Sequence, residues 1–331
     1  MTPTKMLFEI RESLTPPKRK RKIILDILIF FAVATVAAVP QNVISTVLLF
    51  IILLTNQAFI DAILSSVSTP TLALEEYSSI LSGLPSWFYA VLLLLSGVMI
   101  IVAILYCRLF EKRSPKTLGF RKEGVLSEYL LGCVIGLLMI SAPVTFCYFT
   151  GFVQIELTKS ANPFMIVIFL LCFLAQGMGE EALFRGYLMT SLLRRHKIWV
   201  AILWNSLLFS LFHLGNASFS LLAFFNIFLF GAFASIFMLK RGSIWAVGAI
   251  HSIWNFAQGN LFGFNVSGNP KFDSVLTSAQ SAKGVWLHGG DFGPEGGFAV
   301  TVLLCISILI ALSIPTKKSE TIQPEQLECI R

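Results

Sequence analysis

The sequence predicts an all-α membrane protein, a polytopic bundle of about eight transmembrane helices. Hydrophobic residues make up 56% of the 331 residues, charged residues only 13%, and the mean hydropathy is +0.79. A soluble domain of this length does not need so much apolar sequence to fill its core. Apolar runs of roughly 20 residues, enough to cross a bilayer, recur along the whole chain. Little sequence remains for a separate soluble domain.

Two of the expected spans are longer than one crossing requires. We expect Pro40 and Gln41 to interrupt the first of them. Gly177 and Gly179 are expected to bend the other, and tilt can absorb the remaining length. The eight spans are residues 23–54, 86–107, 126–150, 163–193, 198–214, 220–239, 243–262 and 298–315.

Lysine and arginine are unevenly distributed between the loops. When eight spans are counted, all but four of the 25 basic residues fall on one side. Such loops face the cytoplasm, which predicts a multi-pass protein of the cell membrane with both termini cytoplasmic. The net charge of +7 then reflects topology and contact with anionic membrane lipids rather than nucleic-acid binding. The four exceptions are Lys159, Arg185, Lys271 and Lys283.

Several segments allow more than one interpretation. The first apolar stretch could be a signal peptide, but the apolar sequence beyond Pro40 and the later spans favour an uncleaved helix. Residues 55–85 contain no Lys or Arg, as expected for an outer loop, and could form an amphipathic surface segment. Residues 263–297 are rich in Gly and polar residues, which is typical of a connecting loop or of a flap over a site open to the outer face. The six cysteines lie singly and predict neither disulfides nor a cysteine zinc site.

A few ionisable groups lie inside the expected spans, where they are costly and usually mark function. Glu181 and Arg185 are four residues apart on one helix face, which predicts an ion pair that lowers the cost of burying both. Glu180 is turned about 100° from that pair, so its carboxylate is free to point elsewhere. His251 and Asn255 are also four apart and can face one cavity. His213 completes the set, four residues after Phe209.

These side chains can hydrolyse a carbonyl compound, and a peptide bond is the favoured substrate. A glutamate and a histidine can activate water as a general base, while a second histidine and an asparagine amide can donate hydrogen bonds to the developing oxyanion. Glu180, His213 and His251 could instead bind one divalent metal ion such as zinc, because catalytic zinc commonly has three protein ligands and a water. The alternative for each group is structural, as an isolated ion pair or a packed histidine.

Three motifs in the fourth, fifth and seventh expected helices resemble those of the CPBP intramembrane proteases. This family, also called Abi, includes CAAX prenyl endopeptidases and bacteriocin-processing or bacteriocin-immunity enzymes. EExxxR begins at Glu180, FxxxH joins Phe209 to His213, and HxxxN joins His251 to Asn255. The elements VSG and GGDFGPEGG further along the chain resemble an extension of bacterial members. No motif residue departs from the family pattern.

The resemblance implies an intramembrane endopeptidase that acts on a membrane-associated peptide or small membrane protein. Glu180 and His213 would activate the water, and the HxxxN pair would stabilise the oxyanion. Glu181 and Arg185 would hold the first glutamate in place, with Phe209 in a supporting role. The family is described both as metal-free glutamate proteases and as metalloproteases, so a zinc cofactor stays open. A leader peptide, pheromone or bacteriocin fits the bacterial extension better than a prenylated protein does.

Glu180 and His213 are expected at different heights in the membrane. Counting along the spans puts Glu180 about 25 Å from the outer start of its helix, whereas His213 falls near an outer end. The two can meet only if the fourth span starts outside the hydrocarbon or the span boundaries differ.

The resemblance also divides the chain. The expected segments are a basic cytoplasmic arm (1–22), N-terminal transmembrane helices (23–124), a CPBP-like catalytic core (125–262), an outer loop (263–297), and a last transmembrane helix with a cytoplasmic tail (298–331).

Two other functions fit the same residues. One is a membrane scaffold or immunity protein that binds a peptide or sensor partner without cutting it. The other is a transporter in which buried Glu and His relay protons, although the paired halves of many transporters are not visible in the sequence.

Overall fold

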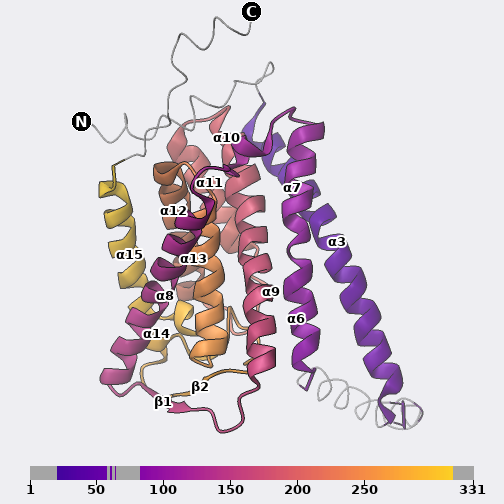
Figure 1. Ribbon diagram of the computed structural model, residues 1–331, viewed down its shortest axis with the longest axis vertical. Helices are drawn as coiled ribbons and strands as arrows, with labels where there is room; N and C mark the ends of the chain where they lie inside the picture. Colours follow the sequence, from indigo (N-terminus) through magenta and orange to yellow (C-terminus); the bar gives the residue numbers. More distant parts are fainter. Residues whose placement is uncertain (1–20, 58–59, 62–63, 65–82, 316–331) are drawn as a thin grey trace, which may run out of the picture.

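The computed structural model describes residues 21–57, 60–61, 64 and 83–315, which form a bundle of roughly aligned helices (Figure 1). The expected surface segment at 55–85 and the basic arm lie largely outside this part of the chain. Within it, five helices are long and apolar enough to cross a membrane. The protein is therefore a multi-pass helical membrane protein, and the count of eight crossings stays a prediction. The five are Ile23–Thr55, Ser86–Leu109, Val125–Phe149, Pro163–Leu193 and Leu221–Arg241.

All eight predicted spans fall on helical segments, although some are shorter than a crossing or divided. The principal helices are α3 (Ile23–Thr55), α6 (Ser86–Leu95), α7 (Val98–Leu109), α8 (Val125–Phe149), α9 (Pro163–Glu181), α10 (Thr190–Leu193), α11 (Ile198–Leu211), α12 (Leu221–Arg241), α13 (Trp245–Phe256), α14 (Val285–His288) and α15 (Phe298–Ser313). The short elements are the π-helical stretches η2 (Ala182–Met189) and η3 (Ala257–Leu261) and the 3₁₀ turns η1 (Pro115–Leu118), η4 (Gly290–Phe292) and η5 (Pro294–Gly296).

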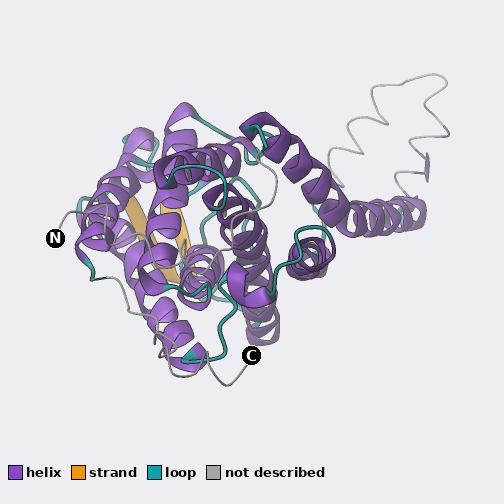
Figure 2. Ribbon diagram, turned by 90° about the horizontal axis from the view of Figure 1, so that it is seen from above, coloured by secondary structure: helices purple, strands orange, loops and turns teal. Residues whose placement is uncertain are grey.

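The first predicted interruption is wrong, because α3 continues through Pro40 to Thr55. Proline is tolerated inside membrane helices when neighbouring groups or small local adjustments satisfy the freed backbone groups. Gln41 also remains helical, and its side-chain oxygen lies 3.4 Å from the Ser96 hydroxyl on the adjoining chain segment. The far end of α3 extends away from the bundle, as Figures 1 and 2 both show.

The predicted bend at Gly177 and Gly179 stays a prediction, and α9 is helical through both residues. These glycines permit close packing. A Cβ atom at Gly177 would lie 2.5 Å from the Ser252 hydroxyl on α13, and one at Gly179 would lie 2.4 Å from the Ser96 carbonyl oxygen. The irregularity comes just afterwards, where α9 passes into η2.

Two short strands correct the all-α prediction. β1 (Val153–Leu157) pairs antiparallel with β2 (Leu276–Gln280), and Val153 lies opposite Gln280. The strands form because two loops that leave the bundle at the same end can satisfy each other's backbone groups. Figure 2 shows the pair across one end of the bundle. The sheet thereby attaches the 263–297 loop to the connection between α8 and α9.

The opposite end of the bundle collects the loops predicted to be basic. Glu111, just after α7, accepts hydrogen bonds from Arg194 and Arg195, which follow α10. Lys240, near the end of α12, donates to the carbonyl oxygens of Leu312 and Ile314 at the end of α15. The predicted grouping of these loops at one end is therefore confirmed, while their cytoplasmic location stays a prediction.

Candidate active site

The two glutamates of the first motif lie where α9 ends against α13. Glu181 and Arg185 form the ion pair predicted from their spacing, with 2.9 Å between Oε1 and Nη1, and both side chains are 0% exposed. His251 joins them, since its Nδ1 lies 2.9 Å from the same Glu181 oxygen. The ring can therefore donate from Nδ1 to this carboxylate. The first and third motifs thus meet in one buried cluster.

Arg185 and Phe209 account for two further motif positions. Arg185 lies in η2, a π-helical turn of the kind found frequently at functional sites. Its guanidinium carbon lies 4.1 Å from the centroid of the Phe209 ring, a distance suited to a cation–π contact. Phe209 also contacts the rings of His213 and His251, at centroid distances of 5.0 and 5.9 Å. The aromatic ring of the second motif therefore packs between the arginine and both histidines.

Glu180 faces a different environment from that of its neighbour. Its side chain is 18% exposed, and its Oε2 lies 3.8 Å from His251 Nε2. Gln176, one turn earlier on α9, donates to Glu180 Oε1 at 2.5 Å and accepts from Asn255 Nδ2 at 3.0 Å. Gln176 is a site residue that sequence reasoning missed. The signal that could have found it is a polar side chain four residues before Glu180 in an otherwise apolar helix.

The height difference expected between Glu180 and His213 is resolved by unequal helix lengths. The helix that carries Glu180 runs 31 residues from Pro163 to Leu193, whereas α11 has only 14. Glu180 therefore stands about 20 Å from the end of its helix at Leu193, and α11 covers about 21 Å before the turn that holds His213. Both residues reach the same cavity. The fourth helix simply extends further than α11 does.

A cavity of about 320 Å³ brings these groups together. Glu180, Gln176, His213 and Asn255 contribute polar groups to its wall. His213 Nδ1 lies 2.8 Å from the carbonyl oxygen of Phe209. Because a carbonyl oxygen can only accept a hydrogen bond, Nδ1 carries the proton of the neutral ring and Nε2 carries the lone pair. The apolar wall includes Tyr89, Leu92, Leu93, Phe173, Phe184, Phe212 and Phe272.

The 263–297 loop forms part of this site. Ser267 and Asn269 line the large cavity. Asn216, in the turn after His213, donates to the Ser267 carbonyl oxygen at 2.8 Å, which attaches the loop to that turn. The placement agrees with the interpretation of this segment as a cover over the site rather than a remote connection.

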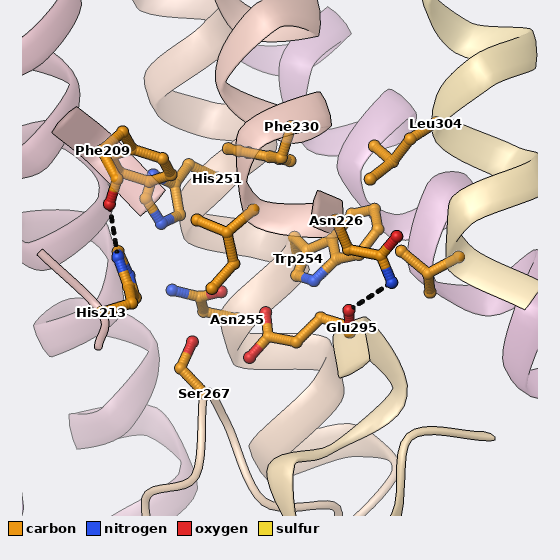
Figure 3. Close-up of a pocket in the computed structure, with 12 residues that line it drawn as sticks. Phe209, His213, Asn226, Phe230, His251, Trp254, Asn255, Ser267, Glu295 and Leu304 are labelled. Carbon is orange, nitrogen blue, oxygen red and sulfur yellow. Dashed lines mark hydrogen bonds between the residues drawn. The ribbon is translucent and has the colours of Figure 1, made fainter. Parts of the chain in front are cut away.

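A second, smaller cavity of about 30 Å³ lies beside the two histidines (Figure 3). His213, His251 and Asn255 line it together with Ser267 and Glu295. Burial raises the pKa of Glu295 above the ordinary glutamate value, although Ser267 and the histidines partly oppose that shift. Sequence reasoning missed Glu295 because no helical spacing relates a loop residue to the three motifs.

Glu180, His213 and His251 stay the predicted candidates for a zinc site. His251 Nδ1 contacts the Glu181 carboxylate and His213 Nδ1 contacts the Phe209 carbonyl oxygen. Contacts of this kind also orient metal-bound histidines, which bind the metal through the other ring nitrogen. Across the described ranges, no three or more His, Cys, Asp or Glu side chains are grouped so as to hold a metal ion.

Comparison with protein families supports the resemblance drawn from the motifs. Residues 162–257 match the family described as type II CAAX prenyl endopeptidase Rce1-like. This region contains all three motifs, so the predicted relationship to the CPBP proteases is confirmed there, over less than a third of the chain. The matching family is a family of proteases. A comparison with curated proteins finds no significant match.

Proposed function

We propose that this protein is an intramembrane endopeptidase in which Glu180 activates a water molecule for peptide-bond hydrolysis. The observation that carries the proposal is the division between adjacent glutamates. Glu181 is enclosed with Arg185 and His251, whereas Glu180 is partly exposed on a cavity shared with His213 and Asn255. A carboxylate beside a water-accessible cavity can act as a general base.

The proposed reaction uses the contacts of each side chain. Glu180 takes a proton from the water while the water oxygen bonds to the carbonyl carbon. The His213 ring, held by the Phe209 carbonyl, presents the Nε2 lone pair that orients this water. When the C–N bond breaks, Glu180 returns the proton to the departing amine nitrogen. This cycle balances the atoms of hydrolysis and restores Glu180.

The oxyanion would be stabilised by Asn255 and His251. One hydrogen of the Asn255 amide is directed to Gln176, which leaves the second for the oxyanion. His251 donates from Nδ1 to Glu181, and when the ring carries both protons its Nε2 donates as well. Fixed donors of this kind are among the largest contributions to acyl-transfer catalysis.

The substrate class follows from the cavity wall. Aromatic and aliphatic side chains of α6 and α9 surround the polar groups, and small residues of α3, Ala34 and Ala38, complete one side. Such a wall suits an apolar peptide segment rather than a charged one. We therefore assign a membrane-associated peptide or small membrane protein as the substrate, which accords with the CAAX-type protease family that the core matches.

The test is peptide release by the purified full chain from a panel of membrane-associated peptides. Wild type is compared with Glu180→Gln, which keeps the side-chain shape and the Gln176 contact, each with and without chelator. The proposal expects cleavage by wild type in both lanes and a loss of at least about 100-fold in the variant. Inhibition by chelator together with stoichiometric bound metal would support a metalloprotease instead. Binding of a peptide without cleavage would support the immunity or scaffold function.

A further inference from the structure

Glu295 is a buried acidic residue outside the three motifs and beyond the family match. It lies in η5, immediately before α15, and only 9% of its surface is exposed. Its Oε1 has no hydrogen-bond partner among the residues that the structure describes. A buried carboxyl oxygen without a partner is costly unless water or a functional group satisfies it. Such an atom beside the proposed active site requires an explanation.

The backbone around Glu295 is fixed from α12. Asn226 donates through Nδ2 to the carbonyl oxygens of Glu295 at 2.8 Å and Gly297 at 2.9 Å. Its own Oδ1 accepts a hydrogen bond from Thr301 at 2.6 Å. Gly293, just before η5, has a φ of +105°, and a Cβ there would lie 2.2 Å from the Asn265 carbonyl oxygen. The segment is therefore held in one place by polar contacts and close packing.

The carboxyl group of Glu295 lines the 30 Å³ cavity, on the side opposite the His213 ring in Figure 3. A water molecule requires about 10–15 Å³ of such space and two to four polar partners. The cavity meets both conditions, because Ser267, Asn255 and both histidines also line it. Ser267 adopts a left-handed φ of +50°, which is uncommon for a residue with a side chain and is found at functional sites.

From this geometry we infer that Glu295 is a positioning residue of the active site, which holds a water in the 30 Å³ cavity and so fixes the cavity wall that His213, His251 and Asn255 form. The inference rests on the proposed protease function. It adds a carboxyl group from the loop before α15, whereas the three motifs lie on α9, α11 and α13. Glu295 does not line the 320 Å³ cavity assigned to the substrate. Its loss should therefore affect turnover more than substrate binding.

The test compares kcat and KM for wild type, Glu295→Gln and Glu295→Asp, with the folded fraction measured for each. Asp291→Asn is the control, because Asp291 is an exposed carboxylate of the same loop. We expect Glu295→Gln to lower kcat about 10- to 100-fold, as is typical when a group that orients a catalytic side chain is lost, with KM within about twofold of wild type. Glu295→Asp, which retains a carboxyl group, should recover part of that loss.

Each outcome of this experiment has a distinct meaning. Wild-type kcat in folded Glu295→Gln overturns the inference and leaves the proposed function intact. Equal loss in Glu295→Gln and Glu295→Asp, with less folded protein in both, assigns Glu295 a structural role and also overturns it. If Glu295→Gln does not fold, Glu295→Asp decides alone through its kcat per folded molecule. If wild type cleaves no peptide while Glu180→Gln behaves identically, the proposed function fails and this inference fails with it.

Discussion

Two buried ionic clusters in this protein differ in how completely their polar groups are satisfied. The motif cluster consists of Glu180, Glu181, Arg185 and His251. The helix-end cluster consists of Asp26, Glu111, Arg113, Arg194, Arg195 and His196.

The helix-end cluster distributes its charges over many partners. Glu111 accepts from Arg113 at 2.7 Å, from Ser191 at 2.8 Å and, at longer range, from Arg195 at 3.4 Å. Arg113 donates also to Thr190 and Ser191, both at 2.8 Å. Among the buried side-chain atoms of the described residues, Arg195 Nε is the one in this cluster without a hydrogen-bond partner. These contacts join the loop after α7 to the end of α10.

In the motif cluster, more buried polar atoms of the described residues lack a hydrogen-bond partner than in the helix-end cluster. Within the part of the chain that the structure describes, Glu180 Oε2, Glu181 Oε2 and two nitrogens of Arg185 have no hydrogen-bond partner. Glu180 also lines the cavity of about 320 Å³. Buried charge alone therefore does not distinguish a functional site, since both clusters have it. Unsatisfied polar atoms beside a cavity are what separate the motif cluster from the structural one.

The largest expected effect comes from the cation of the motif cluster. Arg185→Met removes one of the two partners of fully buried Glu181 and leaves it with His251 alone. Breaking a buried ion pair of this kind costs about 3–5 kcal/mol. The folded yield and the thermal midpoint should both fall. Arg108→Met, at an exposed position near the end of α7, is the control and should leave both unchanged. Wild-type yield and midpoint for Arg185→Met would show that the pair is not required for folding.

A smaller effect is expected at Gln176, which contacts Glu180 of the motif cluster and not the Glu181–Arg185 pair. Gln176→Leu keeps the size of the side chain but breaks the hydrogen bonds to Glu180 and Asn255. We expect kcat to fall about 10- to 100-fold, a range seen when orienting partners are removed, with loss of stability limited to about 1–3 kcal/mol. Steady-state kinetics normalised to folded protein measure this. An unchanged kcat would mean that Glu180 needs no orientation from α9.

The helix-end cluster should respond in stability alone. Glu111→Gln weakens the contacts to Arg113 and Arg195, so we expect a loss of about 1–3 kcal/mol and unchanged kcat per folded molecule. Thermal unfolding and peptide release measured on one preparation test this. A loss of kcat without loss of stability would remove the distinction between the clusters.

The smallest expected effect is a pH dependence of the stability that Glu111 contributes. Burial opposes ionisation of Glu111, but Arg113, Ser191 and Arg195 outweigh it, and its pKa lies below the ordinary glutamate value. A carboxyl group with a lowered folded-state pKa stabilises the fold above its unfolded pKa and loses that contribution as pH falls through the folded pKa. The difference in thermal midpoint between wild type and Glu111→Gln should therefore be largest near neutral pH and shrink under acidic conditions. A difference that does not vary with pH would contradict the assignment.

Helical spacing predicted some contacts of the site and could not predict others. The Glu181–Arg185 pair follows from a separation of four residues on one helix. The placement of Glu180 and His213 on one cavity depends on the length difference between two helices, which hydropathy does not define. Gln176 carries no charge, so it is not among the ionisable groups of the expected spans. Its position between Glu180 and Asn255 was therefore not predicted.

In the fold, too, some features were predicted from the sequence and others were not. Hydropathy located the helices because each needs an apolar run. The antiparallel pairing of β1 with β2 joins segments more than a hundred residues apart, which local pattern does not relate. Glu295 reaches the motif histidines through that same loop. Tertiary contacts of this kind are decided by packing between elements rather than by the sequence of either one.

A comparison of the two adjacent glutamates distinguishes their proposed roles, catalysis for Glu180 and structural support for Glu181. Peptide release and thermal unfolding are measured for wild type, Glu180→Gln and Glu181→Gln, purified identically. We expect Glu180→Gln to unfold near the wild-type midpoint but to lose cleavage. Glu181→Gln should have a lower midpoint and a lower folded yield, because Arg185 and His251 share its carboxylate. Retained cleavage in Glu180→Gln, or a loss of stability equal to that of Glu181→Gln, would show that the two glutamates do not have these separate roles.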